Sequence, residues 1–229
     1  MKIKLSLISL FTFFTLLSQN QERYENWSSL EVDYSIAKNI NIYGSGQLRI
    51  QSVGDIYNQS FYEIGLKIKI NEFLRSGFAY RGLDQLQDVE NNQLHKKFNR
   101  YHVFLAGTYD FKKYNFLIRL QFQQKNGVGN HDFIIKDFFR TKFELTRDII
   151  DWKADPIIGI EFFTKENLNF DKNFKKYRFS IGTKLNLNDL NSLSINYLFQ
   201  KQIKVDFPVS QHILRLNYNF SFKRIYFFE

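Results

Sequence analysis

The feature that most constrains this chain is a strict alternation of residue types between positions 177 and 200. Every second residue over 177–187 is apolar, except Thr183, and the residues between them are charged, polar or glycine. The alternation resumes after a short polar segment, 188–191. A period of two residues is that of a β-strand, whose neighbouring side chains point to opposite faces. The segment is therefore predicted to form an antiparallel hairpin.

The same alternation recurs along the chain, in eleven strand candidates. Short turns near residues 37, 71, 110, 147 and 188 alternate with longer polar loops. The strand candidates are 28–36, 40–51, 62–70, 75–81, 100–109, 116–123, 139–145, 158–162, 177–187, 193–200 and 212–222. The longer loops are 52–58, 84–97, 125–131, 164–174 and 203–209.

Short turns at one end and long loops at the other are typical of bacterial outer-membrane barrels, as is apolar-out, polar-in alternation. A water-soluble barrel or sandwich also shows alternation, but would have to bury the arginines of the polar row in a dry core, which is costly. The fold class predicted is all-β: a single antiparallel up-and-down transmembrane β-barrel of about 10–12 strands.

The number of candidates, eleven, is odd, whereas single-chain bacterial barrels have even strand numbers. Either a further strand lies in residues 19–27 or 223–229, or one candidate is not a strand.

The first eighteen residues have the pattern of a signal peptide. Lys2 and Lys4 precede a mostly apolar run, 5–17, and Ser18 offers a small residue for cleavage. The run is too short for a transmembrane helix, which needs about 20 apolar residues. We therefore expect a signal peptide over 1–18, a barrel domain over 19–229 and location in the outer membrane, with membrane lipid and the barrel-assembly machinery as partners and a monomer as the favoured state.

Composition limits the chemistry. The chain has no cysteine, so no disulfide or thiolate metal site is expected. The net charge of +9 is spread along the strands without a basic block, so nucleic acid is not an expected partner. Its four histidines lack a ligand spacing, and we expect no metal or cofactor.

The polar row is the candidate site. It carries basic residues on nearly every predicted strand, together with a few carboxylates. Two interpretations stay open: a basic constriction that favours anions, and a salt-bridged network that fills and stiffens the barrel. The candidate lumen-facing residues are Glu31, Arg49, Glu63, Arg81, Arg100, His102, Arg119, Arg140, Glu144, Glu161, Arg178 and Arg215.

An enzyme would need a nucleophile beside a base. Ser210 and His212 lie two residues apart on one face, but no third, orienting carboxylate is evident, so no catalytic residues are predicted. The chain is expected to be an outer-membrane barrel of unknown physiological role, either structural or a narrow, weakly anion-preferring pore. The alternative is a lipid-modifying hydrolase that uses the Ser210/His212 pair.

A series of short motifs resembles, in its order, the uncharacterised bacterial family known as domain of unknown function 2490. The motifs are WSSLEVDY, QLRI, GFAYR, RYHVFL, IRLQFQ, FFRTKFEL, PIIGIEFF, YRFSIGTKL and LSINY. The resemblance covers nearly the whole chain after the leader. It implies an outer-membrane barrel and implies no activity or catalytic residues.

Overall fold

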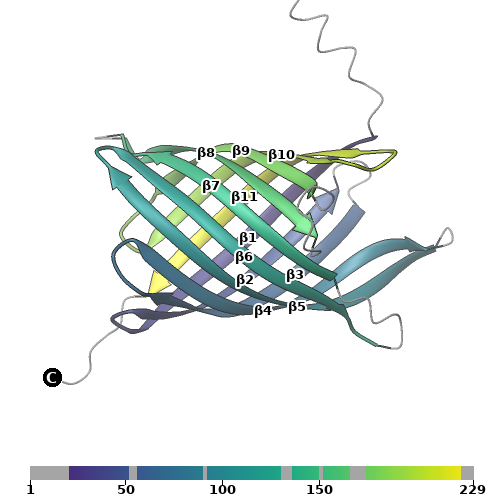
Figure 1. Ribbon diagram of the computed structural model, residues 1–229, viewed down its shortest axis with the longest axis horizontal. Helices are drawn as coiled ribbons and strands as arrows, with labels where there is room; N and C mark the ends of the chain where they lie inside the picture. The colour runs from purple at the N-terminus through teal and green to yellow at the C-terminus, as the bar shows by residue number, and fades with distance from the viewer. Residues whose placement is uncertain are drawn as a thin grey trace, which may run out of the picture.

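Over the residues that the structure describes, the chain folds into one closed barrel of eleven tilted β-strands, seen from the side in Figure 1. The structure is a computed structural model that describes residues 21–51, 56–89, 92–129, 136–149, 152–165 and 174–222. The strands are β1 (Gln21–Ala37), β2 (Ile40–Gln51), β3 (Ile56–Lys69), β4 (Leu74–Val89), β5 (Asn92–Phe111), β6 (Tyr114–Gly127), β7 (Lys136–Arg147), β8 (Ala154–Lys165), β9 (Phe174–Asn186), β10 (Asn191–Gln202) and β11 (Val209–Phe222). No helix among these residues is long and apolar enough to cross a membrane.

Strands that follow one another in sequence pair in antiparallel fashion around the barrel, but β1 and β11 close it in parallel, with Gln21 opposite Val209. Direction alternates from strand to strand, so an odd number of strands leaves the first and last running the same way. The all-β closed barrel is confirmed; the parallel closure is a departure from the purely antiparallel sheet predicted. The described part of segment 19–27 forms the start of β1, and 1–18 and 223–229 lie outside the described residues.

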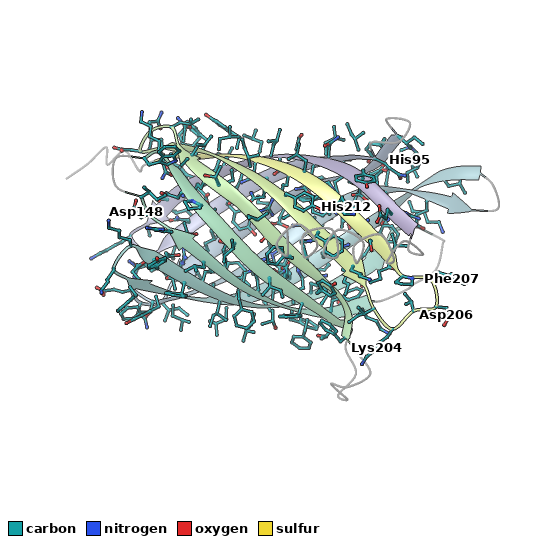
Figure 2. The ribbon with its side chains drawn as sticks, turned by 90° about the horizontal axis from the view of Figure 1, so that it is seen from above. His95, Asp148, Lys204, Asp206, Phe207 and His212 are labelled. Carbon is teal, nitrogen blue, oxygen red and sulfur yellow. The ribbon has the colours of Figure 1, made fainter. Side chains whose placement is uncertain are left out.

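Two ends of the barrel can be distinguished. The turn end holds the connections 38–39, 70–73, 112–113, 148–153 and 187–190, and the loop end holds the others. Asp148 at the turn end and Phe207 at the loop end lie at opposite ends of the molecule in Figure 2. Because β1 starts where β11 starts, residues 21 and 222 also lie at opposite ends of the barrel.

The prediction of a loop over residues 84–97 is wrong. β4 continues to Val89 and β5 begins at Asn92, so most of this segment is a projecting hairpin whose register pairs Asp84 with Lys97 and Leu86 with His95. Its residues are largely polar on both faces, because the hairpin extends beyond the part of the barrel with an apolar outer face. The alternation that marks the other strands is therefore missing here. The predicted loop 52–58 is also shortened, since β3 begins at Ile56.

The apolar row forms the outer wall. On β6, for example, Ile118 and Leu120 are 49% and 51% exposed, whereas the intervening position 119 belongs to the inner row. The middle of the outer wall is mostly aliphatic. Its exposed members include Leu30, Ile64, Leu66, Val103, Leu105, Ile118, Leu120, Ile158, Ile181, Leu214 and Leu216.

Aromatic side chains border this aliphatic band on its loop side, where they form a belt, here called the loop-side belt. Its members are Tyr24, Tyr62, Tyr80, Tyr101, Phe122, Phe139, Phe162, Tyr177 and Phe199, joined by His212. Rings on adjacent strands contact each other: centroids are 6.2 Å apart for Tyr62 and Tyr80, and 5.2 Å apart for Phe122 and Phe139. Gly82 leaves room for the Tyr62 ring, which occupies the space that a side chain there would need.

A second belt, the turn-side belt, lies at the opposite border. It comprises Tyr34, Phe73, Tyr109, Phe111, Tyr114, Phe116, Trp152, Tyr218 and Phe222, all exposed. Along β5, Tyr101 of the first belt and Tyr109 of the second are separated by roughly 27 Å of strand at ~3.4 Å per residue. At a tilt of about 40° this corresponds to ~20 Å along the barrel axis.

Candidate functional site

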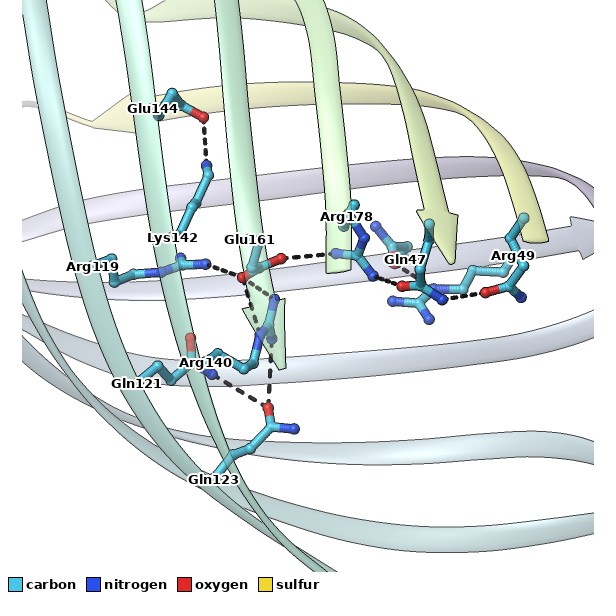
Figure 3. A network of polar contacts seen from close by, with 12 residues as sticks. Gln47, Arg49, Arg119, Gln121, Gln123, Arg140, Lys142, Glu144, Glu161 and Arg178 are labelled. Atoms are coloured by element: carbon cyan, nitrogen blue, oxygen red, sulfur yellow. Dashed lines mark hydrogen bonds and ion pairs between the residues drawn. The ribbon is translucent and has the colours of Figure 1, made fainter. Parts of the chain in front are cut away.

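The interior of the barrel is crossed by side chains of the polar row, and Glu161 on β8 is the centre of their largest cluster. The residue is only 5% exposed. Oε1 accepts hydrogen bonds from Arg140 Nη2 at 2.7 Å and Arg119 Nη2 at 3.3 Å, and Oε2 accepts one from Arg178 Nη1 at 3.1 Å. Figure 3 shows the three guanidinium groups converging on this carboxylate. One buried anion therefore ties together β6, β7, β8 and β9.

A second buried carboxylate, Glu63 on β3, organises the opposite wall. Its Oε2 accepts from Arg81 Nε on β4 at 2.6 Å, and its Oε1 accepts from the Tyr43 hydroxyl on β2 at 3.0 Å. His102 Nδ1 on β5 lies 3.9 Å from Oε2, too far for a hydrogen bond. These contacts link β2, β3 and β4, and bring His102 of β5 alongside.

The parallel closure is bridged on its inner side by Glu25 of β1. Its Oε2 accepts from the indole Nε1 of Trp27 at 2.7 Å, and its Oε1 accepts from Gln211 Nε2 of β11 at 2.8 Å. Gln200 on β10 extends this series of hydrogen bonds, because its side chain donates to Gln211 and accepts from Arg178 Nη2 at 2.7 Å. The Glu161 cluster is thus connected across the seam to β1.

Buried cations stack on aromatic rings that point inward. The guanidinium carbon of Arg49 lies 3.8 Å from the Trp27 ring centroid, and that of Arg81 lies 3.8 Å from the Phe61 centroid. Phe163 on β8 is approached by Arg140, Arg178 and Lys176, with Lys176 Nζ at 4.5 Å. Stacking on a ring face stabilises a cation where water is scarce. The rings therefore help to hold positive charge inside the barrel.

The remaining predicted residues lie apart from these two clusters. Glu31 pairs with Lys67 at 2.7 Å and Glu144 pairs with Lys142. Arg100 and Arg215 make no ion pair within the described ranges, and the buried Nε atom of each has no hydrogen-bond partner there. Positive charge in the interior is therefore only partly matched by carboxylates.

Sequence reasoning missed several members of the interior. The alternation places Trp27 in the same row as Glu25 and Ser29, so its inward direction could have been read from the pattern. Its large apolar ring concealed this, because an aromatic residue in a barrel strand is expected on the lipid side. Four residues that contact the clusters belong to the predicted polar row but were not candidates: Tyr43, Lys67, Lys142 and Gln200. The residues that were missed altogether are Glu25, Trp27, Phe61, Phe163, Lys176 and Gln211.

His212 lies on the outer wall as a member of the loop-side belt. Its Nδ1 is 2.6 Å from the Tyr197 hydroxyl, and its ring stacks on Tyr24 with centroids 4.9 Å apart. Ser210 is buried. No hydrogen bond joins Ser210 to His212 in the structure as described, so the pair is not arranged as a nucleophile and its base.

Within the described residues, no group of three or more His, Asp or Glu side chains is placed to hold a metal ion.

A comparison with protein families gives a match over most of the chain. The model of a family described as "Protein of unknown function (DUF2490)" matches residues 24–206, which includes ten of the strands in full or in large part. No curated protein matches the chain significantly.

Proposed function

The chain belongs to the DUF2490 family of proteins of unknown function, and we propose that it is an integral β-barrel of the bacterial outer membrane, exported by a cleaved signal peptide. The observation that supports this most is the outer wall: an exposed aliphatic band bordered by aromatic belts on both sides. Transmembrane barrels have such a band, about 25 Å tall, between two aromatic girdles. In water the same surface would be a large apolar patch prone to association.

The loop-side belt would mark the outer border of the hydrocarbon. Beyond it, toward the loops, outward-facing positions become polar, as expected for wall that projects from a bilayer. These positions include Ser60, Asp84, Lys97, Asn99, Gln124 and Lys201. The proposed partners are accordingly membrane lipid around the band and the barrel-assembly machinery during insertion, with a monomer as the proposed state.

Cysteine labelling tests this arrangement, because the chain has no native cysteine. Phe207 is 82% exposed in the connection between β10 and β11, and Asp148 lies at the turn end. We expect a membrane-impermeant maleimide to label Phe207→Cys on intact cells and Asp148→Cys only after the outer membrane is opened. Equal labelling of the two variants on intact cells, or labelling of neither in membrane fractions, would contradict the proposal.

The interior supports a second, finer proposal, a narrow pore that prefers anions. Cations line the middle of the barrel in excess over carboxylates, and rings of basic side chains favour anions in pores. Barrels of this size fall between small ones filled by side chains and large ones with open channels. The polar clusters would then narrow the passage rather than seal it.

Conductance in planar bilayers tests the pore. We expect small ion steps whose reversal potential in a KCl gradient has the sign of chloride selectivity, and we expect the steps to be absent after the protein is heat-denatured. If the folded barrel gave no steps at any voltage, the pore proposal would be removed and a structural role for the filled barrel would remain.

A further inference from the structure

Positive charge is concentrated in the middle and loop-side parts of the interior. Within the described residues, the cations there include Arg49, Arg81, Arg100, Arg119, Arg140, Lys142, Lys176, Arg178 and Arg215. The carboxylates there are Glu25, Glu63, Glu144 and Glu161. Each of these carboxylates already has partners, because it accepts hydrogen bonds from neighbouring side chains or forms an ion pair with one. Part of the cationic charge therefore has no anion beside it.

Lys176 is the clearest case. In the described structure its ammonium group makes no hydrogen bond or ion pair, and it lies over the Phe163 ring, with Nζ 4.5 Å from the ring centroid. Arg140 and Arg178, which are also cations, approach the same ring, at 4.9 and 5.0 Å from its centroid. A buried ammonium group in such surroundings is unfavourable unless an anion or water solvates it.

Among the described residues, Arg100 and Arg49 likewise have no carboxylate as a hydrogen-bond partner. Arg100 has a buried Nε with no partner within the described ranges. Arg49 donates only to uncharged amide oxygens, from Nε to Gln47 at 2.7 Å and from Nη1 to Gln59 at 3.4 Å. The nearby carboxylates, Glu25 for Arg49 and Glu63 for Arg100, already have other donors.

These three side chains come from separate walls of the barrel: Arg49 from β2, Arg100 from β5 and Lys176 from β9. Shared aromatic rings connect these walls. Arg49 of β2 and Arg178 of β9 lie 3.8 and 5.1 Å from the Trp27 ring centroid, and Arg81, directly opposite Arg100, shares the Phe61 ring with Arg49. Three like charges brought near one another from different sides of the barrel form a cradle for an anion.

We propose that Lys176, Arg100 and Arg49 bind a phosphate-like oxyanion, free or as a phosphate monoester, inside the loop-side half of the barrel. Guanidinium groups match the oxygens of phosphate as paired donors, and an ammonium group adds a point charge. The ring faces of Trp27 and Phe163 are already covered by cations, so they are not available to stack a planar aromatic ligand. The inference deepens the proposed function, since it rests on an interior open to solutes and gives the anion preference a definite site.

Titration calorimetry of the folded barrel in a zwitterionic detergent at low ionic strength tests the site, with inorganic phosphate and glycerol 3-phosphate titrated separately. We expect saturable binding of at least one of them, with one site per chain. Binding of inorganic phosphate alone would assign the free ion, and tighter binding of glycerol 3-phosphate would assign a monoester. No saturable heat with either anion would overturn the proposal.

The decisive variant is Lys176→Gln, which should weaken binding about tenfold or more, as expected for loss of one charge-assisted hydrogen bond. Arg75→Gln is the matched control, because Arg75 is an exposed member of the inner row at the turn end and carries the same charge. The affinity of Arg75→Gln for the anion should stay within about twofold of that of the unchanged protein, since screening weakens the effect of a distant charge. Arg100→Gln provides a second variant if Lys176→Gln does not fold. If Arg75→Gln weakened anion binding as much as Lys176→Gln or Arg100→Gln, the effect would come from the overall charge of the barrel, and the proposed site would be refuted.

Conductance measurements distinguish the proposal of a phosphate site from the proposal of a pore. A barrel that conducts ions but does not bind phosphate would refute the site and leave the pore standing. A barrel that binds phosphate but does not conduct would retain the site and refute the pore.

Discussion

Replacing Ile181 with arginine is expected to lower the free energy of unfolding from a bilayer by about 2–4 kcal/mol, the cost of a cationic side chain near the bilayer midplane. Ile181 is on the outer face of β9, 51% exposed, between the two aromatic belts. Urea titration of the barrel in liposomes, followed by heat-modifiable gel mobility, measures the change.

The matched control is Gln124→Arg, which places the same charge on the outer face of β6, two residues beyond Phe122 of the loop-side belt. Near the interface the cost falls to about 0–1 kcal/mol. A change of less than about 0.5 kcal/mol for Ile181→Arg itself would contradict a lipid-facing wall, because that is the effect expected of an exposed residue on a water-soluble protein.

Replacing Glu161 with glutamine is expected to destabilise the barrel by about 3–5 kcal/mol, the usual cost of removing one partner from a buried ionic cluster. The substitution keeps the size of the side chain but leaves Arg119, Arg140 and Arg178 without their shared anion. The same urea titration reports the loss.

Asp206→Asn serves as control, since it removes one negative charge from an exposed position in the connection before β11 and should be nearly neutral. Adding Arg119→Gln to Glu161→Gln should restore part of the stability, because one of the mutually repelling guanidinium groups is then gone. An unchanged urea midpoint for Glu161→Gln would show that the three arginines do not depend on this carboxylate.

The alternation predicts which residues face inward and which face outward, because this depends only on the two-residue period of a strand. Ile118 and Arg119 on β6 illustrate this, and the same rule extends along the whole barrel. Local pattern also placed the five short turns close to where they occur.

Register and closure could not be predicted in this way. Glu161 meets Arg178 because the two residues are directly opposite on β8 and β9, and it reaches Arg119 two strands away because long side chains span the interior. Alternation assigns a face but does not specify which residue lies opposite which. The parallel β1–β11 pairing likewise depends on the total number of strands, and the β4–β5 hairpin lacks an apolar row that would reveal it.

The central claim is that the aliphatic outer wall faces lipid while the charged row faces the interior. The most direct test is a spin-label scan along β6, residues 114–127, in liposomes, measuring collision with apolar oxygen and with a water-soluble nickel complex. We predict oxygen accessibility with a period of two residues, highest at Phe116, Ile118, Leu120 and Phe122 and falling at Gln124. High nickel accessibility at Ile118 and Leu120, equal to that at Gln124, would contradict the account.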